Sequence, residues 1–533
     1  MFECAEGPEF KWLGVEPSSR KRPPQELFPG WRRRTSDASQ GERPMYKPSD
    51  PQKPLFDAGG LLPPGKRERC EASWAGAFRR NALPILRRVD DEFAALFDQE
   101  MGRPNRPVEL VVGTLILKEI SDLTDEEALQ ALEFDTRWWY ALSREPHEMH
   151  LCQKTLHNFR AGLMKHDKSK VAFRKVTDEL IGALGVSVER QRLDSTHVLS
   201  NIAMRNRLGL FVDVIRKFLK AARGLDEKGY AGIGEKLTGR YAEERRYEDA
   251  RKQEGPKRVG VAARDVCRLI DRFEEHERIS KTEEYKLLER LYEEQCDVTL
   301  EPEEPGKDDD DHGEGGACVV AKEPKDIGGD SLQSAHDAEA TYSGKKGKGY
   351  EAQVAETCVE GNPVQLITEV EVTRSCQSDQ KATVPVVEAL VAANLKPKEL
   401  VADAAFSGAE NAAALAAEGV HLLAPAAPGG KPVEGQAYPA PAPVCPMEEK
   451  QAVEWLRQQE ASPEFKERYK IRSGIESTNA ELKGKHGLRK LRVRGEDRVK
   501  LALYMKALAC NVKRALRAWL TLKPAVEGAA VLA

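Results

Sequence analysis

The chain has 533 residues, more than one hydrophobic core usually accommodates, so two or three domains are expected. Apolar residues make up 40% and charged residues 32% of the sequence, and neither a secretory signal nor a run of roughly 18 apolar residues is present, which excludes a membrane-spanning protein and predicts a cytoplasmic one. The formal charge is only -4, and the 10 cysteines are scattered without a Cys-x-x-Cys pair, which argues against a disulfide framework or a zinc ribbon.

The N-terminal third of the sequence has two parts. Residues 1–44 are rich in Pro, Ser, Arg and Gly and lack hydrophobic periodicity, so we predict a disordered extension and regard Met45 as a candidate start. Over residues 45–185, apolar side chains recur every three or four positions, which predicts an all-α domain. Thr124 to Glu127 has the spacing of a capping box. The segment Lys154 to Arg160 is compatible with a nucleic-acid-binding helix-turn-helix and equally with an ordinary helical bundle.

A second fold begins with a short β-like segment that runs from Val186 to Asp194. We therefore place the first strand of this fold within residues 186–202, with Asp194 at the end of the strand. His197 follows shortly after. It could serve as an acid or a base, or it could have a structural role.

Helical spacing returns after this strand. Apolar residues follow a period of three to four over residues 203–300, and such stripes are typical of a helical core rather than of a cofactor site. The run from Glu301 to Asp311 is acidic and contains prolines, and it lacks the alternating ligands and closing Glu of a calcium loop, so a solvated linker is the better interpretation. We predict a helical insertion with an acidic linker over residues 203–330.

Strand signals resume in residues 331–515. Two β segments joined by the turn Glu360 to Pro363 predict a hairpin, and a short apolar strand, Leu400 to Ala402, leads into Asp403. The stretch 425–446 is rich in Pro and Gly, which indicates an irregular segment. The other elements predicted here are the hairpin strands Tyr350 to Thr357 and Val364 to Val372, the helices 384–394 and 408–417, and the strand Val420 to Leu423.

The C-terminal part of the sequence is strongly basic. Residues 461–520 contain 16 Lys and Arg against 6 Asp and Glu, a net charge of +10, and residues 516–533 are predicted as a tail. The run Tyr469-x2-Arg472-x3-Glu476-x6-Lys483 would lie within roughly 60° on one stripe of an α-helix. Further basic residues would extend a track for a polyanion rather than form a merely solvated face, and these are Lys485, Arg489 and Arg492.

Three acidic residues occupy positions suited to metal ligands. Asp194 and Asp403 are predicted at strand ends and Glu476 on a helix, so a mixed sheet with the first strand central would bring them together. Converging carboxylates repel one another unless cations compensate, which favours two divalent ions, and all-oxygen ligation suits Mg²⁺. Taken singly, each acid could also be a turn residue or a surface ion-pair partner.

The sequence resembles the RNase-H-like DDE transposases of bacterial insertion sequences in three motifs, Leu193-Asp194-Ser195-Thr196-His197, Val401-Ala402-Asp403-Ala404-Ala405-Phe406-Ser407 and Tyr469-x2-Arg472-x3-Glu476-x6-Lys483. The resemblance implies an α/β fold. It would be an RNase-H-like (retroviral-integrase-like) mixed sheet with flanking helices, preceded by an all-α N-terminal domain and interrupted by the helical insertion.

The resemblance also implies the site and its partners. Asp194, Asp403 and Glu476 would be catalytic and would bind two Mg²⁺ ions, for which Mn²⁺ could substitute. The reaction would be DNA strand cleavage and transfer at the element's terminal repeats, into target DNA, by a dimer or larger assembly at the nucleoid. The residues expected to bind DNA are Tyr469, Arg472, Lys483, Lys485, Arg489 and Arg492.

Two other functions fit the same residues. A DNA-binding regulator derived from a transposase would keep the fold and the basic surface without catalysis. A metal-dependent nuclease would share the site but would not transfer strands. The sequence contains no Walker-type phosphate loop, Gly-x-Ser-x-Gly or His-Glu-x-x-His motif, which argues against NTPases, serine hydrolases and that class of metalloproteases.

Overall fold

The computed structural model describes most of the chain, and every described residue belongs to the unit Met45–Ala533. The predicted extension 1–44, the candidate start Met45, the acidic run 301–311 and nearly all of the stretch 425–446 lie outside the described residues. Among the described helices, none is long and apolar enough to cross a membrane. The described residues are 46, 48, 58–97, 105–243, 246–249, 254–299, 318–426 and 449–522.

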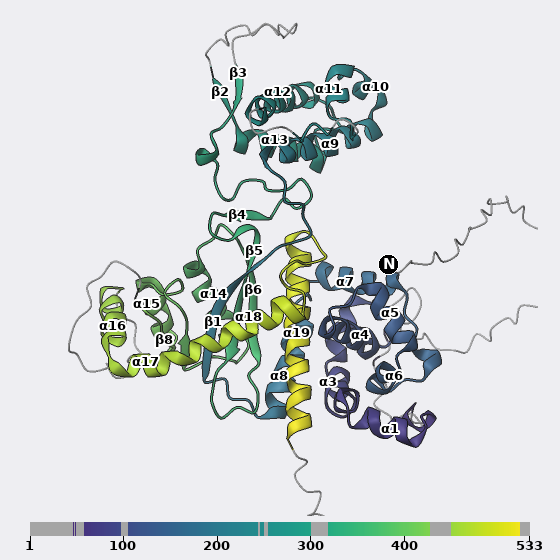
Figure 1. Cartoon of the computed structure of the whole chain (residues 1–533), viewed down its shortest axis with the longest axis vertical. Coiled ribbons are helices and arrows are strands. Elements are labelled where there is room, and N and C mark those ends of the chain that lie inside the picture. The colour runs from purple at the N-terminus through teal and green to yellow at the C-terminus, as the bar shows by residue number, and fades with distance from the viewer. Residues whose placement is uncertain are drawn as a thin grey trace, which may run out of the picture. The chain divides into compact units, whose positions relative to one another are not determined.

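Short helices form the N-terminal part of this unit (Figure 1). The helix α4 is buried along nearly its whole length, as its dense run of apolar residues requires. The capping box predicted at Thr124 is present, because the Thr124 hydroxyl accepts from the Glu127 N–H and the Glu127 carboxylate accepts from the Thr124 N–H. The helices are α1 (Pro64–Glu71), α2 (Trp74–Ala77), α3 (Leu83–Arg88), α4 (Val108–Ile120), α5 (Asp125–Phe134), α6 (Thr136–Leu142), α7 (Gln153–Lys165) and α8 (Val171–Leu184).

A six-stranded mixed sheet follows, with the order β4-β5-β1-β7-β8 and with β6 paired to β5. The strand β1 is central, since it pairs antiparallel with β5 and parallel with β7. The flanking helices and this mixed pairing are the features expected of an RNase-H-like sheet. The strands are β1 (Arg190–Val198), β4 (Thr341–Ser343), β5 (Gly347–Thr357), β6 (Ile367–Arg374), β7 (Glu399–Val401) and β8 (His421–Leu423).

The prediction that the first strand ends at Asp194 is wrong. β5 pairs with β1 as far as Val198, so Asp194 lies in the middle of the strand. Two of the polar residues beyond Asp194 have polar partners. Ser195 Oγ accepts from Lys346 Nζ at 3.2 Å. His197 Nδ1 lies 3.0 Å from Oε1 of the fully buried Glu351, a contact that fits the structural role considered for this histidine.

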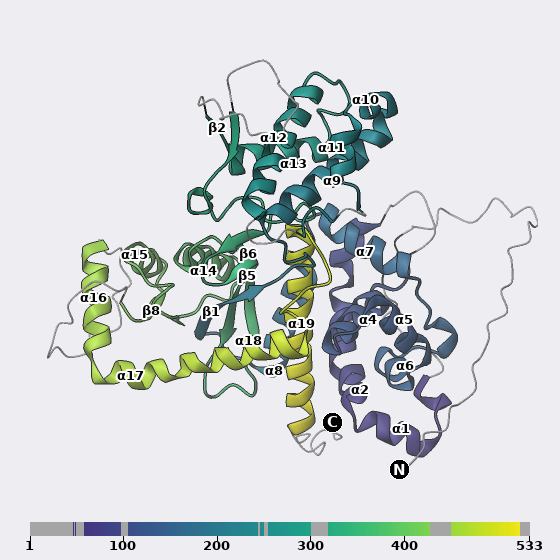
Figure 2. The ribbon, with the colours of Figure 1, turned by 45° about the horizontal axis from the view of Figure 1, so that its top comes forward.

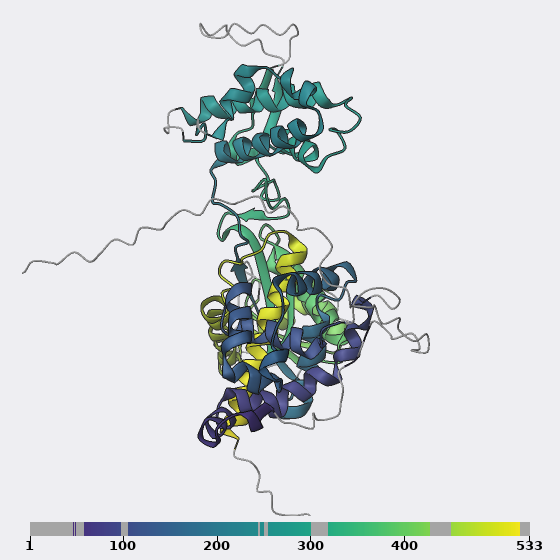
Figure 3. The ribbon, with the colours of Figure 1, turned by 90° about the vertical axis from the view of Figure 1, so that its right-hand side faces the viewer.

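The region predicted as a helical insertion has a hydrophobic cluster of its own. Its helices α9, α12 and α13 pack side by side (Figure 3). The Phe218 ring meets the edge of Phe273 with centroids 5.5 Å apart, and it also lies against Tyr285. The elements are α9 (Arg207–Leu225), α10 (Glu227–Ala231), α11 (Glu235–Arg240), α12 (Gly255–Phe273), α13 (Glu283–Gln295) and the antiparallel pair β2 (Cys296–Thr299) and β3 (Cys318–Ala321).

The long helix α19 (Glu496–Thr521) joins the N-terminal helices to the sheet (Figure 2). It packs against α4, α8 and β6, and residues of all these elements share one hydrophobic cluster. The side chain of Asn511 accepts from the Ile367 N–H and donates to the Ile367 carbonyl, both at 2.8 Å. The segment predicted as a tail, 516–533, therefore begins inside a helix.

The residues from Tyr469 to Lys483 do not form one continuous α-helix, contrary to the predicted stripe. The Ile471 carbonyl accepts from the Gly474 N–H, as in a 3-10 turn, and also from Arg192 Nη1 at 2.6 Å. Arg192, on β1, thereby stabilises a tighter turn between two α-helices. The elements of this part are α14 (Thr383–Ala392), α15 (Ala409–Ala417), α16 (Glu449–Ala461), α17 (Pro463–Tyr469), the 3-10 turn Lys470–Ser473 and α18 (Gly474–Lys485).

Candidate active site

The three acids singled out in the sequence come from three different elements. Asp194 lies in β1, Asp403 follows β7, and Glu476 lies in the first turn of α18. All three carboxylates contact the guanidinium of Arg472. Its Nη2 lies 3.3 Å from Asp194 Oδ1 and 3.4 Å from Asp403 Oδ2, and its Nη1 lies 3.3 Å from Glu476 Oε1. The fold thus brings these distant residues together.

The three carboxylates differ in their exposure to solvent. The side chain of Asp194 is 14% exposed, that of Asp403 34% and that of Glu476 67%. Burial raises the pKa of Asp194, Arg472 acts in the opposite direction, and the neighbouring charge of Asp403 raises it further. Three carboxylates share one guanidinium, so additional positive charge would stabilise the ionised site.

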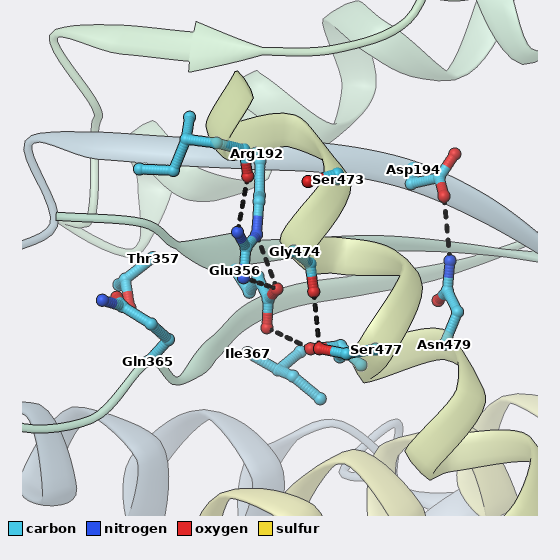
Figure 4. A network of polar contacts seen from close by, with 12 residues as sticks. Arg192, Asp194, Glu356, Thr357, Gln365, Ile367, Ser473, Gly474, Ser477 and Asn479 are labelled. Carbon is cyan, nitrogen blue, oxygen red and sulfur yellow. Dashed lines mark hydrogen bonds and ion pairs between the residues drawn. The ribbon is translucent and has the colours of Figure 1, made fainter. Parts of the chain in front are cut away.

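Asn479 is a contact of Asp194 that the sequence did not predict. Its Nδ2 donates to Asp194 Oδ2 at 3.0 Å (Figure 4). Asn479 lies on α18, three residues after Glu476 and four before Lys483, so these side chains share one face of the helix. Helical spacing from Glu476 was the signal that could have pointed to it.

Tyr469 and Lys483 lie close to the acids. The Tyr469 ring stacks on Phe465 with centroids 5.0 Å apart. Burial raises the pKa of Tyr469 to about 12, so the phenol is a neutral donor at neutral pH. Burial lowers the pKa of Lys483, whereas the charges of Glu351 and Asp194 act to raise it. The charge of Asp194 affects the pKa of both side chains, so both lie near enough to contact a molecule bound between the three carboxylates.

The basic residues beyond Lys483 have different surroundings. Lys485 and Arg489 are exposed. Arg492 Nη1 donates to Asp122 Oδ1 at 2.9 Å, and its Nη2 donates to the Asp122 carbonyl at 2.9 Å, so this arginine links the segment after α18 to the loop after α4. In the segment considered for a helix-turn-helix, Arg160 likewise has a partner within the protein, since it bonds to the Asp125 carboxylate. DNA binding by these side chains stays a prediction.

A buried network anchors α18 to the sheet (Figure 4). The fully buried carboxylate of Glu356, on β5, accepts from Arg192 Nε at 2.7 Å and from Arg514 Nη1 at 3.0 Å. Thr478 of α18 donates to the same carboxylate at 2.6 Å. Side chains from β1, β5, α18 and α19 meet in this network, which fixes the helix that carries Glu476.

A second group of potential ligands lies on the buried side of α18. Within the described part of the chain, ligand atoms of Glu481, His486 and Cys510 lie within 4.8 Å of one another. However, Arg514 Nε lies 3.2 Å and Lys513 Nζ 3.7 Å from the Glu481 carboxylate. The existing positive charges disfavour a further cation at this position.

The mixed sheet, its flanking helices and the three acids around β1 and β7 define an RNase-H-like protein. Residues 318–512 match the family model of the transposase DDE domain, and residues 79–162 match that of a transposase domain (DUF772). Both matches are consistent with a DDE transposase of an insertion sequence. No curated protein and no solved structure matches it. The first match includes Asp403 and Glu476, whereas Asp194 precedes it because the inserted helices separate β1 from the rest of the sheet.

Proposed function

We propose that the protein cleaves DNA at the ends of an insertion sequence in a divalent-metal-dependent reaction and transfers the freed 3′ ends into target DNA. One observation carries the proposal: Asp194, Asp403 and Glu476, from three separate elements, meet around Arg472. DDE transposase domains generally use divalent metals. A regulator without catalysis has no physical need to keep three mutually repelling carboxylates together.

The donor set fits hard divalent cations. Carboxylate oxygens are the ligands that Mg²⁺ prefers, and here three carboxylates outnumber the single guanidinium that contacts them. Asp194, Asp403 and Glu476 would hold two ions, either Mg²⁺ or Mn²⁺. Such ions supply a water of lowered pKa for strand cleavage and stabilise the charge on the leaving 3′-oxygen.

The neighbouring side chains would hold the DNA. Arg472 can bind a phosphate bidentately, and Lys483 provides a point charge. The neutral phenol of Tyr469 can donate a hydrogen bond to a phosphate oxygen. Lys485 and Arg489 are exposed beyond this group and would contact flanking phosphates, so affinity would fall steeply with salt.

We also propose that different segments of the chain have different functions. The N-terminal helices, 45–185, would bind DNA as a domain, and 186–202 together with 331–515 would form the catalytic domain around the helical insertion 203–330. The partners would be the element's terminal repeats and target DNA. Bringing two element ends together requires at least two chains.

Incubation of labelled element-end DNA with Mg²⁺ tests the proposal. We expect the wild type to cut and transfer strands, and Asp194→Ala, Asp403→Ala and Glu476→Ala each to cut at least about 100-fold more slowly. Asp297→Ala removes an exposed acid of the insertion and should cut normally. Equal cutting by all variants would refute the triad. A wild type that binds without cutting would indicate a regulator, and cutting without transfer would indicate a nuclease.

A further inference from the structure

The two carboxylate oxygens of Asp194 have different partners. Asn479 Nδ2 donates to Oδ2 at 3.0 Å, whereas Oδ1 contacts Arg472 Nη2 at 3.3 Å (Figure 4 shows the first of these contacts). The same guanidinium contacts Asp403 and Glu476. One oxygen of Asp194 is therefore held by an amide, and the other faces the space that the three acids share.

The amide of Asn479 has one favourable orientation. An ionised carboxylate only accepts hydrogen bonds, so turning the amide over would place Asn479 Oδ1 against another acceptor. The residue is 8% exposed, and among the described residues no donor reaches its Oδ1. The hydrogen bond to Asp194 thus determines how this side chain is oriented.

We propose that Asn479 is a positioning residue that orients Asp194 for metal binding, an inference that rests on the proposed function. By holding Oδ2, it fixes the carboxylate so that Oδ1 faces the other two acids. Asn479 and Glu476 lie one helical turn apart on α18, so the same hydrogen bond also sets the distance between the acid on the helix and the acid on β1. Partners of this kind, which touch a ligand but not the metal, commonly tune metal affinity.

Thr478, the preceding residue, provides a matched control. It is also buried, and its hydroxyl donates to Glu356 at 2.6 Å and accepts from Arg514 at 2.7 Å. Replacing either Thr478 or Asn479 removes buried hydrogen bonds of α18. Of the two, Asn479 is the one that contacts an acid of the site.

Calorimetric titration with Mn²⁺ in the absence of DNA tests the inference on the full chain. We expect Asn479→Leu and Asn479→Ala to bind Mn²⁺ about 10- to 100-fold more weakly than the wild type. Thr478→Val should melt at a lower temperature but keep the wild-type Mn²⁺ affinity. In cleavage assays, the half-saturating Mn²⁺ concentration of the Asn479 variants should rise in proportion, while their metal-free affinity for element-end DNA stays unchanged.

The outcomes separate the inference from the proposed function. A wild type that neither binds Mn²⁺ nor cuts DNA would overturn both. If the wild type binds Mn²⁺ and cuts, but the Asn479 variants bind Mn²⁺ equally well, the inference alone is refuted. Equal weakening in Asn479→Leu and Thr478→Val would mean that any loosening of α18 has this effect, and it would also refute the positioning role.

Discussion

Two clusters of charged side chains contact α18, and they are built in opposite ways. At Glu356, one fully buried carboxylate receives two guanidinium groups and a hydroxyl, and one of these guanidinium groups, that of Arg514, also contacts the Glu481 carboxylate at 3.2 Å, so two positive charges face two negative ones. At Asp194, three carboxylates share the guanidinium of Arg472. The first cluster is electrostatically matched and holds the helix in place. The second has an excess of negative charge, which agrees with the metal-binding function proposed for it.

Removing the carboxylate of the matched cluster should have the largest effect on stability. Glu356→Ala leaves Arg192 and Arg514 buried without this partner, so we expect the free energy of unfolding to fall by about 3–5 kcal/mol, measured by urea denaturation. Glu476→Ala is the control from the unmatched cluster. Its carboxylate is 67% exposed, so its removal should change stability by no more than about 0.5 kcal/mol. Equal losses of unfolding free energy in Glu356→Ala and Glu476→Ala would contradict the distinction between a structural cluster and an unmatched one.

The buried side chain of His486, the residue that follows α18, should also make stability depend on pH. Burial lowers the pKa of His486 from 6.5 to about 4, although its hydrogen bond to the Glu119 carbonyl acts in the opposite direction. Between these two pH values the unfolded chain binds a proton that the folded chain does not bind. Stability should therefore be full above pH 6.5 and fall towards pH 4, by up to about 3 kcal/mol.

Urea denaturation at a series of pH values measures this effect. His486→Gln cannot titrate, so the part of the slope that His486 contributes should disappear in that variant. An unchanged slope would assign the pH dependence to other groups.

The smallest effect concerns the unmatched cluster. Because the guanidinium of Arg472 lies among the three acids, Arg472→Ala should strengthen Mn²⁺ binding without DNA by up to about tenfold, the contribution of a few partly exposed ion pairs. The same change should weaken binding to element-end DNA. It should also reduce the slope of log affinity against log salt concentration by about one. Lys483→Ala should show the same loss of salt slope with a smaller gain in Mn²⁺ affinity. Weaker Mn²⁺ binding by Arg472→Ala would mean that the arginine organises the acids instead of competing with metal.

Much of the fold around Asp403 could be predicted, because its signals are local. A short apolar run before an acid indicates a strand end, and β7 ends just before Asp403. The helices expected at 384–394 and 408–417 correspond to α14 and α15. The spacing of Arg472, Glu476 and Lys483 could likewise be recognised in the sequence. The function of Glu476 as part of a triad stays a prediction.

The features that the sequence did not reveal depend on contacts between distant segments. β1 continues beyond Asp194 because β5, which follows the helical insertion, pairs with it. The 3-10 turn after Tyr469 depends on the side chain of Arg192. Helical spacing places Asn479 on the same face as Glu476, but its partner Asp194 lies on a strand far away in the sequence, so the hydrogen bond itself was not predictable.

The contact between Asn511 and Ile367 has a consequence for the edge of the sheet. β6 pairs with β5 on one side, and an open strand edge invites a strand from another molecule. The Asn511 amide imitates a peptide group of a neighbouring strand, since it satisfies both the N–H and the carbonyl of Ile367. With α19 packed against β6, a strand from another molecule cannot pair with this edge at Ile367 unless α19 first moves away.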